Sequence, residues 1–142
     1  MLLDEIANYL TTTYAATTPS LAEGVNLFLS RIQDSPDFCV SIYESPLSPG
    51  QYTLDGGKRV YEEANLQVIV RDSEWNYLAA RQFIERVINL LDAVNDQVLG
   101  GTRYIRITVE NAPMPLPADS RDRIMLSANF HVIKDLSVVT SP

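Results

Sequence analysis

The segment from Leu66 to Asp92 constrains the fold most, because its hydrophobic period changes once along its length. Between positions 66 and 71 the side chains alternate and both faces carry apolar residues, which predicts an interior strand of a sheet. From position 75 onward apolar residues recur every three or four positions, as in an amphipathic helix. The stripe comprises Trp75, Ala79, Phe83, Val87, Leu90 and Val94, widened by Leu78, Ile84, Ile88 and Leu91.

The beginning of this helix carries its own signals. We expect Asp72 or Ser73 to serve as N-cap, and Glu74 lies in the first turn, where the helix dipole favours an anion. Trp75 could be a binding anchor, but a large side chain that closes the end of a core is the favoured interpretation. The Gly100-Gly101 pair interrupts the pattern beyond the helix.

Composition indicates one globular domain. The chain has 142 residues, of which 46% are hydrophobic and 20% charged, enough for a sizeable core. We expect a single α+β domain over residues 1–134 and a flexible tail over residues 135–142. The first residues lack the basic region of a signal peptide, and no apolar run is long enough to span a membrane.

The charge balance disfavours nucleic-acid binding through a basic patch. The net charge is −7 and the isoelectric point is about 4.5. An acidic surface would suit a protein past which DNA slides without specific binding, but ordinary soluble acidity is the favoured explanation.

Periodicity and turn residues predict the remaining elements. A short amphipathic helix is expected near residues 2–12, and strands near residues 25–31 and 38–43, joined as a hairpin by the turn at residues 33–37. Two more strands are expected at residues 104–110 and 124–133. The resulting fold class is α+β, with an antiparallel or mixed sheet of about four to five strands and two helices packed on one face.

No residue pattern supports catalysis. Residues 55–58 lack the spacing and setting of a phosphate-binding loop, and one histidine (His131) and one cysteine (Cys39) cannot form a structural zinc site. Glu62 and Glu63 are adjacent in a strand pattern and would face opposite sides of the sheet. We therefore expect no catalytic, cofactor-binding or metal-binding residue, and no enzyme activity.

Two long loops carry apolar residues that a monomer would be expected to bury. Residues 45–58 contain two prolines and three glycines, and residues 111–120 contain three prolines. Apolar residues exposed on loops indicate an interface, and Arg and Tyr are residue types enriched at interfaces. The interface candidates are Tyr52, Leu54, Arg59, Tyr61, Met114 and Leu116.

Several segments together resemble a known family. They are MLLDEIANYL at the start, CVSIYE at residues 39–44, LQVIVRD at residues 66–72, an aromatic and AAR pattern at residues 77–81, and SANFHVI at residues 127–133. In content and order, over roughly residues 1–134, the chain resembles the minor capsid or tail-completion proteins of long-tailed bacteriophages, the tail terminator group.

The resemblance implies a structural protein of the virion tail or neck, assembled in the host cytoplasm. It implies a homohexameric ring that caps the tail tube, stops its polymerisation and forms the joint to the head. The implied partners are further copies of the chain, the tail tube protein and a head-tail connector protein, and DNA would pass through the bore without specific binding. No cofactor or membrane is implied. Two alternatives stay open: another head-tail connector or head-completion protein, and a small ligand-binding regulatory domain.

Overall fold

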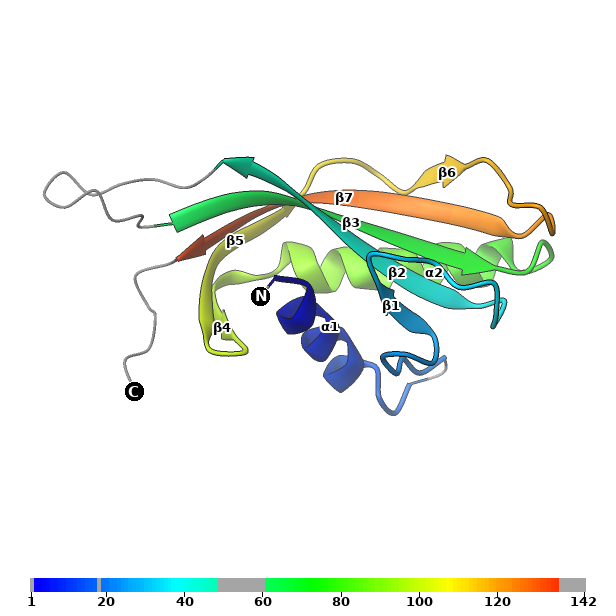
Figure 1. The fold of residues 1–142 in the computed structure, drawn as a ribbon, viewed down its shortest axis with the longest axis horizontal. Coiled ribbons are helices and arrows are strands. Elements are labelled where there is room, and N and C mark those ends of the chain that lie inside the picture. The colour runs from blue at the N-terminus through cyan, green and yellow to red at the C-terminus, as the bar shows by residue number, and fades with distance from the viewer. Residues whose placement is uncertain (1, 18, 49–60, 136–142) are drawn as a thin grey trace, which may run out of the picture.

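The computed structural model describes residues 2–17, 19–48 and 61–135, which form an α+β fold of two helices and a mixed sheet (Figure 1). This confirms the predicted fold class, with more strands than the sequence indicates. The elements are α1 (Leu2–Thr13), β1 (Leu27–Leu29), β2 (Cys39–Ser48), β3 (Tyr61–Asp72), α2 (Tyr77–Asp92), β4 (Asn95–Leu99), β5 (Thr102–Val109), β6 (Met114–Leu116) and β7 (Ile124–Asp135).

The sheet is organised around the antiparallel pair β3 and β7. Its strand order is β1-β2-β3-β7-β5-β4, and β6 also pairs with β7. The two central strands have 12 residues each and pair along their whole length, from Tyr61 opposite Asp135 to Asp72 opposite Ile124. The interior position expected for the strand at Leu66 is therefore confirmed.

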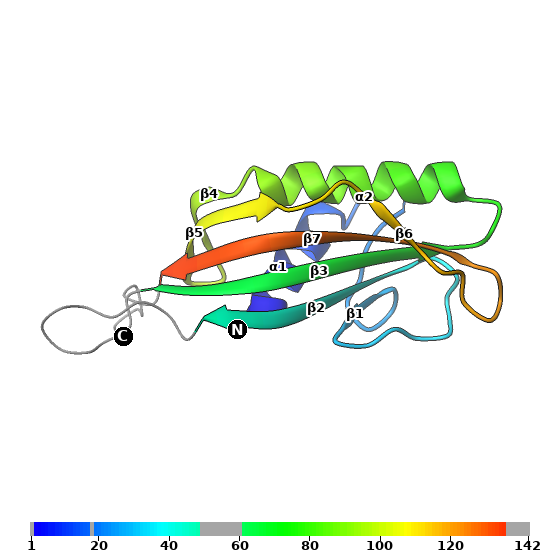
Figure 2. The same ribbon diagram turned by 90° about the horizontal axis from the view of Figure 1, so that it is seen from above.

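Both helices cover the same face of the sheet (Figures 1 and 2). The long helix α2 packs on β3, β5 and β7, while α1 packs on β1, β2 and β4. Alternate strand residues point into this one core, as period-two patterning requires. Inward-facing members are Leu66, Val68, Val70, Leu126, Ala128, Phe130 and Val132 from the strands, and Ile6, Leu10, Phe83, Ile84, Val87 and Leu91 from the helices. Neither helix is long and apolar enough to cross a membrane.

The main helix begins later than predicted. Its N-cap residue is Asn76, whose side chain makes no capping hydrogen bond, so the predicted cap at Asp72 or Ser73 is wrong. The strand continues to Asp72, whose Oδ1 accepts hydrogen bonds from Ser73 N (2.8 Å) and Asn76 Nδ2 (3.3 Å). A turn thus separates strand from helix. It carries Trp75 out of the core, with 87% of its surface exposed, and the expectation of a core tryptophan is wrong.

The first two strands are parallel rather than a hairpin. Leu27 pairs with Val40 and Leu29 with Ile42 in a parallel register, which corrects the predicted antiparallel pair. The intervening residues cross back to the start of β1 before β2 begins, and Ser30 has a left-handed φ of 58° where the chain turns away. The Ser30 amide donates to Ile42 O at 2.8 Å. The turn residues at positions 33–37 indicate that the chain changes direction, but they do not show how far it runs back before β2 begins.

Irregular strand pairing accounts for other differences between the predicted and the observed fold. A register shift between Tyr104 and Arg106 puts both Tyr104 and Ile107 into the core, where strict alternation would have turned Tyr104 outward. Strand β4 is mostly exposed and begins with three polar residues followed by two apolar ones, so its sequence lacks the alternation that would predict a strand. Residues 45–48, expected in a loop, instead extend β2. A bulge near Pro46 interrupts the pairing there, and bulges are among the strand positions where proline is tolerated.

A buried carboxylate ties the first helix to β5. Glu5 Oε1 accepts a hydrogen bond from Tyr104 Oη at 2.6 Å, and its Oε2 accepts one from Thr102 Oγ1. Burial, together with the hydrogen bond to Glu5, raises the pKa of Tyr104 above its ordinary value. Gly100, in the β4–β5 turn, lies against this carboxylate: a Cβ there would be 2.9 Å from Glu5 Cγ.

We predict that Gly100→Ala destabilises the protein more than Gly101→Ala. Both glycines have positive φ, 59° and 86°, so either alanine should cost about 1 kcal/mol of backbone strain. Only Gly100 adds a clash, because Tyr104 and Thr102 hold Glu5 in place. Urea denaturation measures the two free energies of unfolding. Equal losses would show that the contact with Glu5 does not matter.

Candidate assembly surface

The described residues offer no constellation for chemistry. No group of three or more His, Cys, Asp or Glu side chains among them could hold a metal ion. Cys39 is fully buried, and burial raises the pKa of its thiol, which disfavours the reactive thiolate. His131 lies on the polar outer face of β7 with Nε2 2.9 Å from Glu63 Oε1. The surroundings of Cys39 and His131 are those of structural side chains.

The adjacent carboxylates of β3 face opposite sides, as predicted. Glu63 meets His131 on the outer face, whereas Glu62 Oε1 lies 3.5 Å from Lys134 Nζ on the other. The two carboxylates therefore cannot share a proton, and each has a cationic or ionisable neighbour on β7.

The interface candidates separate into two groups. Tyr52, Leu54 and Arg59 lie outside the described residues, while Tyr61 is the first residue of β3 and pairs with Asp135. Met114 pairs with Ser127, eight residues earlier in β7, so Tyr61 and Met114 lie about 26 Å apart along the sheet. These two described candidates therefore belong to different surfaces.

The second proline-rich segment is partly a strand. Residues Met114–Leu116 form β6 on the edge of β7, in place of the expected free loop. Met114 is 46% exposed and Leu116 is half-buried. Pro115 lies within β6 and has no amide hydrogen, so this edge is unsuited to pairing with a strand of another chain. A partner would have to contact its side chains.

Large exposed apolar side chains lie at and just before the start of α2, where Trp75 and Leu78 were expected to belong to the core stripe. Trp75, in the turn before the helix, is 87% exposed, Leu78 is 68% exposed and Tyr77 is 45% exposed. Helical phase could have shown this, because Leu78 is nine residues from Val87, about two and a half turns, and so points to the opposite side. The predicted stripe was too wide, and its first members belong to an exposed patch. We call Trp75, Tyr77 and Leu78 the helix-start patch.

Two grooves mark the surface. One, of about 550 Å³, lies between the second half of α2 and the segment that joins β5 to β6, and it is lined by residues that include Ile88, Val109 and Pro113. The other, of about 530 Å³, lies on the outer face of the sheet and is lined mainly by polar side chains, among them Asn65, Gln67 and Asn129. Neither gathers the acid–base pairs that catalysis would need.

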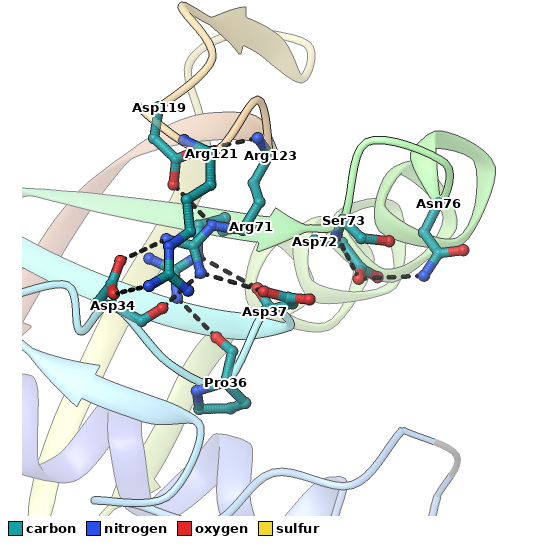
Figure 3. A network of polar contacts seen from close by, with 10 residues as sticks. All are labelled: Asp34, Pro36, Asp37, Arg71, Asp72, Ser73, Asn76, Asp119, Arg121 and Arg123. Atoms are coloured by element: carbon teal, nitrogen blue, oxygen red, sulfur yellow. Dashed lines mark hydrogen bonds and ion pairs between the residues drawn. The ribbon is translucent and has the colours of Figure 1, made fainter.

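Buried arginines hold the loops at the end of the sheet near the helix-start patch (Figure 3). Arg71 donates to Pro36 O at 2.7 Å and to Asp37 O at 3.2 Å, and it is only 2% exposed. Although arginine is enriched at interfaces, Arg71 is thus committed within the monomer. It fixes the segment that crosses back between β1 and β2.

Arg123 is the centre of the same network. Its guanidinium contacts Asp119 at 2.8 Å, Asp34 at 3.0 Å and Asp37 at 3.2 Å, which joins the β6–β7 loop to the loop before β2. Burial acts to raise the pKa of Asp119, but hydrogen bonds from the backbone amides of Arg123 and Arg121 and from the Arg123 side chain outweigh it and lower that pKa. The network makes this end of the molecule rigid.

Comparison with known families assigns the chain. The profile of the bacteriophage tail terminator protein family matches residues 7–136. The chain belongs to this family. A tail terminator protein is a structural component of the virion tail, and this agrees with the expectation of a structural, non-enzymatic protein.

Solved structures support the tail terminator fold. A chain from the virion of a native gene transfer agent particle matches with a TM-score of 0.65 at 15% identity, over 92% of this chain and 93% of that chain. A second solved chain matches with a TM-score of 0.63 at 13% identity, over 94% and 92% respectively. Identities this low establish the fold alone. No match is found among curated proteins.

We predict that Arg123→Leu destabilises this tail terminator protein much more than Arg121→Leu. Both arginines pair with Asp34, but the side chain of Arg123 is 5% exposed and that of Arg121 is 59% exposed. Loss of several buried charged hydrogen bonds should cost about 2–3 kcal/mol, and loss of a surface ion pair less than about 1 kcal/mol. Chemical denaturation of the two variants measures the difference. Comparable losses would mean that the network does not hold the loops.

Proposed function

We propose that this tail terminator protein forms a homohexameric ring that caps the tail tube, stops tube polymerisation and provides the joint to a head-tail connector protein. The observation that carries the proposal is the pairing of family membership with large apolar side chains left exposed on rigid elements. Exposed apolar patches of this kind mark interfaces. A closed ring needs two different patches on each subunit.

The two ends of the central strands supply separate contact regions. Tyr61 lies at one end and follows in sequence the residues that include Tyr52, Leu54 and Arg59; Met114 and Leu116 lie nearer the other end. We propose that one region meets the neighbouring subunit and the other meets the tube or the connector. Separation along the sheet allows both contacts to be made at once.

The charge of the chain suits passage of DNA. Asp and Glu number 18 against 11 Lys and Arg, so a bore lined by average surface would repel phosphate. We propose that DNA crosses the ring without specific binding. A ring structure with Lys and Arg around its bore would contradict this part of the proposal.

The decisive measurement is tube assembly in the presence of the purified protein. We expect tail tube protein to polymerise beyond its normal length alone, and to stop with a six-fold ring at its end when this protein is added. Electron microscopy gives the tube lengths, and native mass spectrometry gives the ring. Unchanged tube length, with binding to portal or adaptor protein instead, would identify a connector component. A chain that binds neither partner would contradict a role at the tube end altogether.

We also predict that Tyr52→Ser combined with Leu54→Ser impairs capping while leaving the melting temperature within a few degrees. Interface side chains contribute to assembly rather than to the monomer core. Leu10→Ser serves as the contrasting control, because Leu10 is fully buried and its loss should lower the melting temperature strongly. A fall of similar size in the double variant would place Tyr52 and Leu54 in the core.

A further inference from the structure

The helix-start patch leaves large apolar surfaces in water, although Tyr77 Oη accepts a hydrogen bond from Arg81 Nη1 at 3.3 Å. Trp75 and Leu78 leave 87% and 68% of their surfaces in water, and Tyr77 leaves 45%. Aromatic side chains and large aliphatic ones that lie together in this way mark contact sites for another chain. The patch was absent from the interface candidates that the sequence indicated.

The patch is mounted rigidly. Asp72 accepts hydrogen bonds from Ser73 and Asn76, and Asn76 in turn begins the helix by accepting from Ala80 N at 3.0 Å (Figure 3). The preceding residue, Arg71, is held by two backbone carbonyls. A preorganised patch loses little conformational entropy when it binds, which favours it as an anchor.

A groove on the same chain is large enough to receive these side chains. It lies against α2, with an apolar lining from Ile88, Val109 and Pro113 and carboxylates from Glu85 and Glu110. Its volume of about 550 Å³ is within the range of about 300–1,000 Å³ typical of sites that bury a small molecule. It can therefore accommodate an indole and a neighbouring leucine side chain.

The groove cannot be filled by the patch of its own subunit. Leu78 and Ile88 are ten residues apart on one straight helix, which separates them by about 15 Å. Patch and groove can therefore meet only between two copies, head to tail. Such a contact is heterologous, the kind that a ring requires.

Charge complementarity favours this pairing. The first turn of α2 has no side-chain cap and no acidic residue, so its amides have no side-chain acceptor, although the nearby Asp72 binds the side chain of the N-cap residue Asn76. Glu110, in the groove, has no ion pair within the described parts of the chain. The carboxylate of one copy would thus compensate the helix end of the next.

We propose that Trp75 and Leu78 of one subunit insert into the groove beside Ile88 and Val109 of the next, with Glu110 facing the uncapped start of the inserted helix. The partner is a second copy of this chain. The inference rests on the proposed ring and specifies which surfaces close it.

Cysteine cross-linking tests the contact in the full-length protein. Glu74→Cys in one copy and Ala112→Cys in another place thiols beside the patch, with Trp75 and Leu78 retained, and at the exposed rim of the groove. Native Cys39 is buried and adds little background. We expect disulfide-linked dimers from the mixture, and a ladder ending in a closed ring when one chain carries both cysteines. Glu74→Cys mixed with Thr12→Cys, exposed on α1, is the matched control.

The alternatives give different cross-links. Linkage of Glu74→Cys to itself would indicate a two-fold contact, and linkage to tail tube protein alone would assign the patch to the tube. Equal linkage with Thr12→Cys would indicate random collision. Each of these results would overturn the proposal.

Loss of the apolar contact tests the same pairing without new thiols. We expect Trp75→Ser combined with Leu78→Ser to weaken ring formation by at least about tenfold, because buried aromatic anchors dominate such interfaces. Val98→Ser, which removes an exposed apolar side chain from β4, should leave ring formation unchanged. If the double variant forms normal rings, this inference is wrong but the proposed function still holds. Failure of the wild-type protein to form rings with tubes would instead overturn the proposed function.

Discussion

The antiparallel pairing of β3 with β7 is the interaction on which the rest of the structure depends. Twelve consecutive residue pairs, from Tyr61 with Asp135 to Asp72 with Ile124, make a ladder that spans the sheet. Because its inward residues are apolar on both strands, the ladder gives both helices one shared core. Because it is long, it also keeps the surfaces at its two ends far apart. A shorter pair could hold a core, but it could not separate two contact regions.

Buried polar groups determine what happens where this ladder ends. Near one end, Glu5 accepts hydrogen bonds from Tyr104 and Thr102, which attaches α1 to β5. At the other end, Arg71 and Arg123 hold the loops before β2 and β7. A buried charge is costly unless its hydrogen bonds are satisfied. Each group therefore fixes one arrangement of the chain around it, more specifically than apolar contact alone would.

These long-range polar contacts also explain what the sequence could and could not predict. The local hydrophobic period was enough to predict α1, the inward faces of β3 and β7, and the body of α2. Burial of one face of an element produces such a period directly. The parallel direction of β1 requires a connecting segment that crosses back, and the carbonyls of this segment bind Arg71, which is far from it in sequence. The inward turn of Tyr104 accompanies a register shift, and β4, which shows no local alternation, pairs with β5. For the candidate surface, the proline-rich segment pointed to Met114, whereas Trp75, expected in the helical stripe, lies in the turn before α2 and is exposed.

The misassigned tryptophan links fold to assembly. A net charge of −7 opposes the approach of two copies, while exposed Trp75 and Leu78 favour it. Two opposing effects of this kind leave association weak at low concentration and strong where copies are held together. The growing end of a tail tube would hold several copies side by side. Under the function proposed above, a subunit balanced in this way would close a ring at the tube and stay dispersed elsewhere.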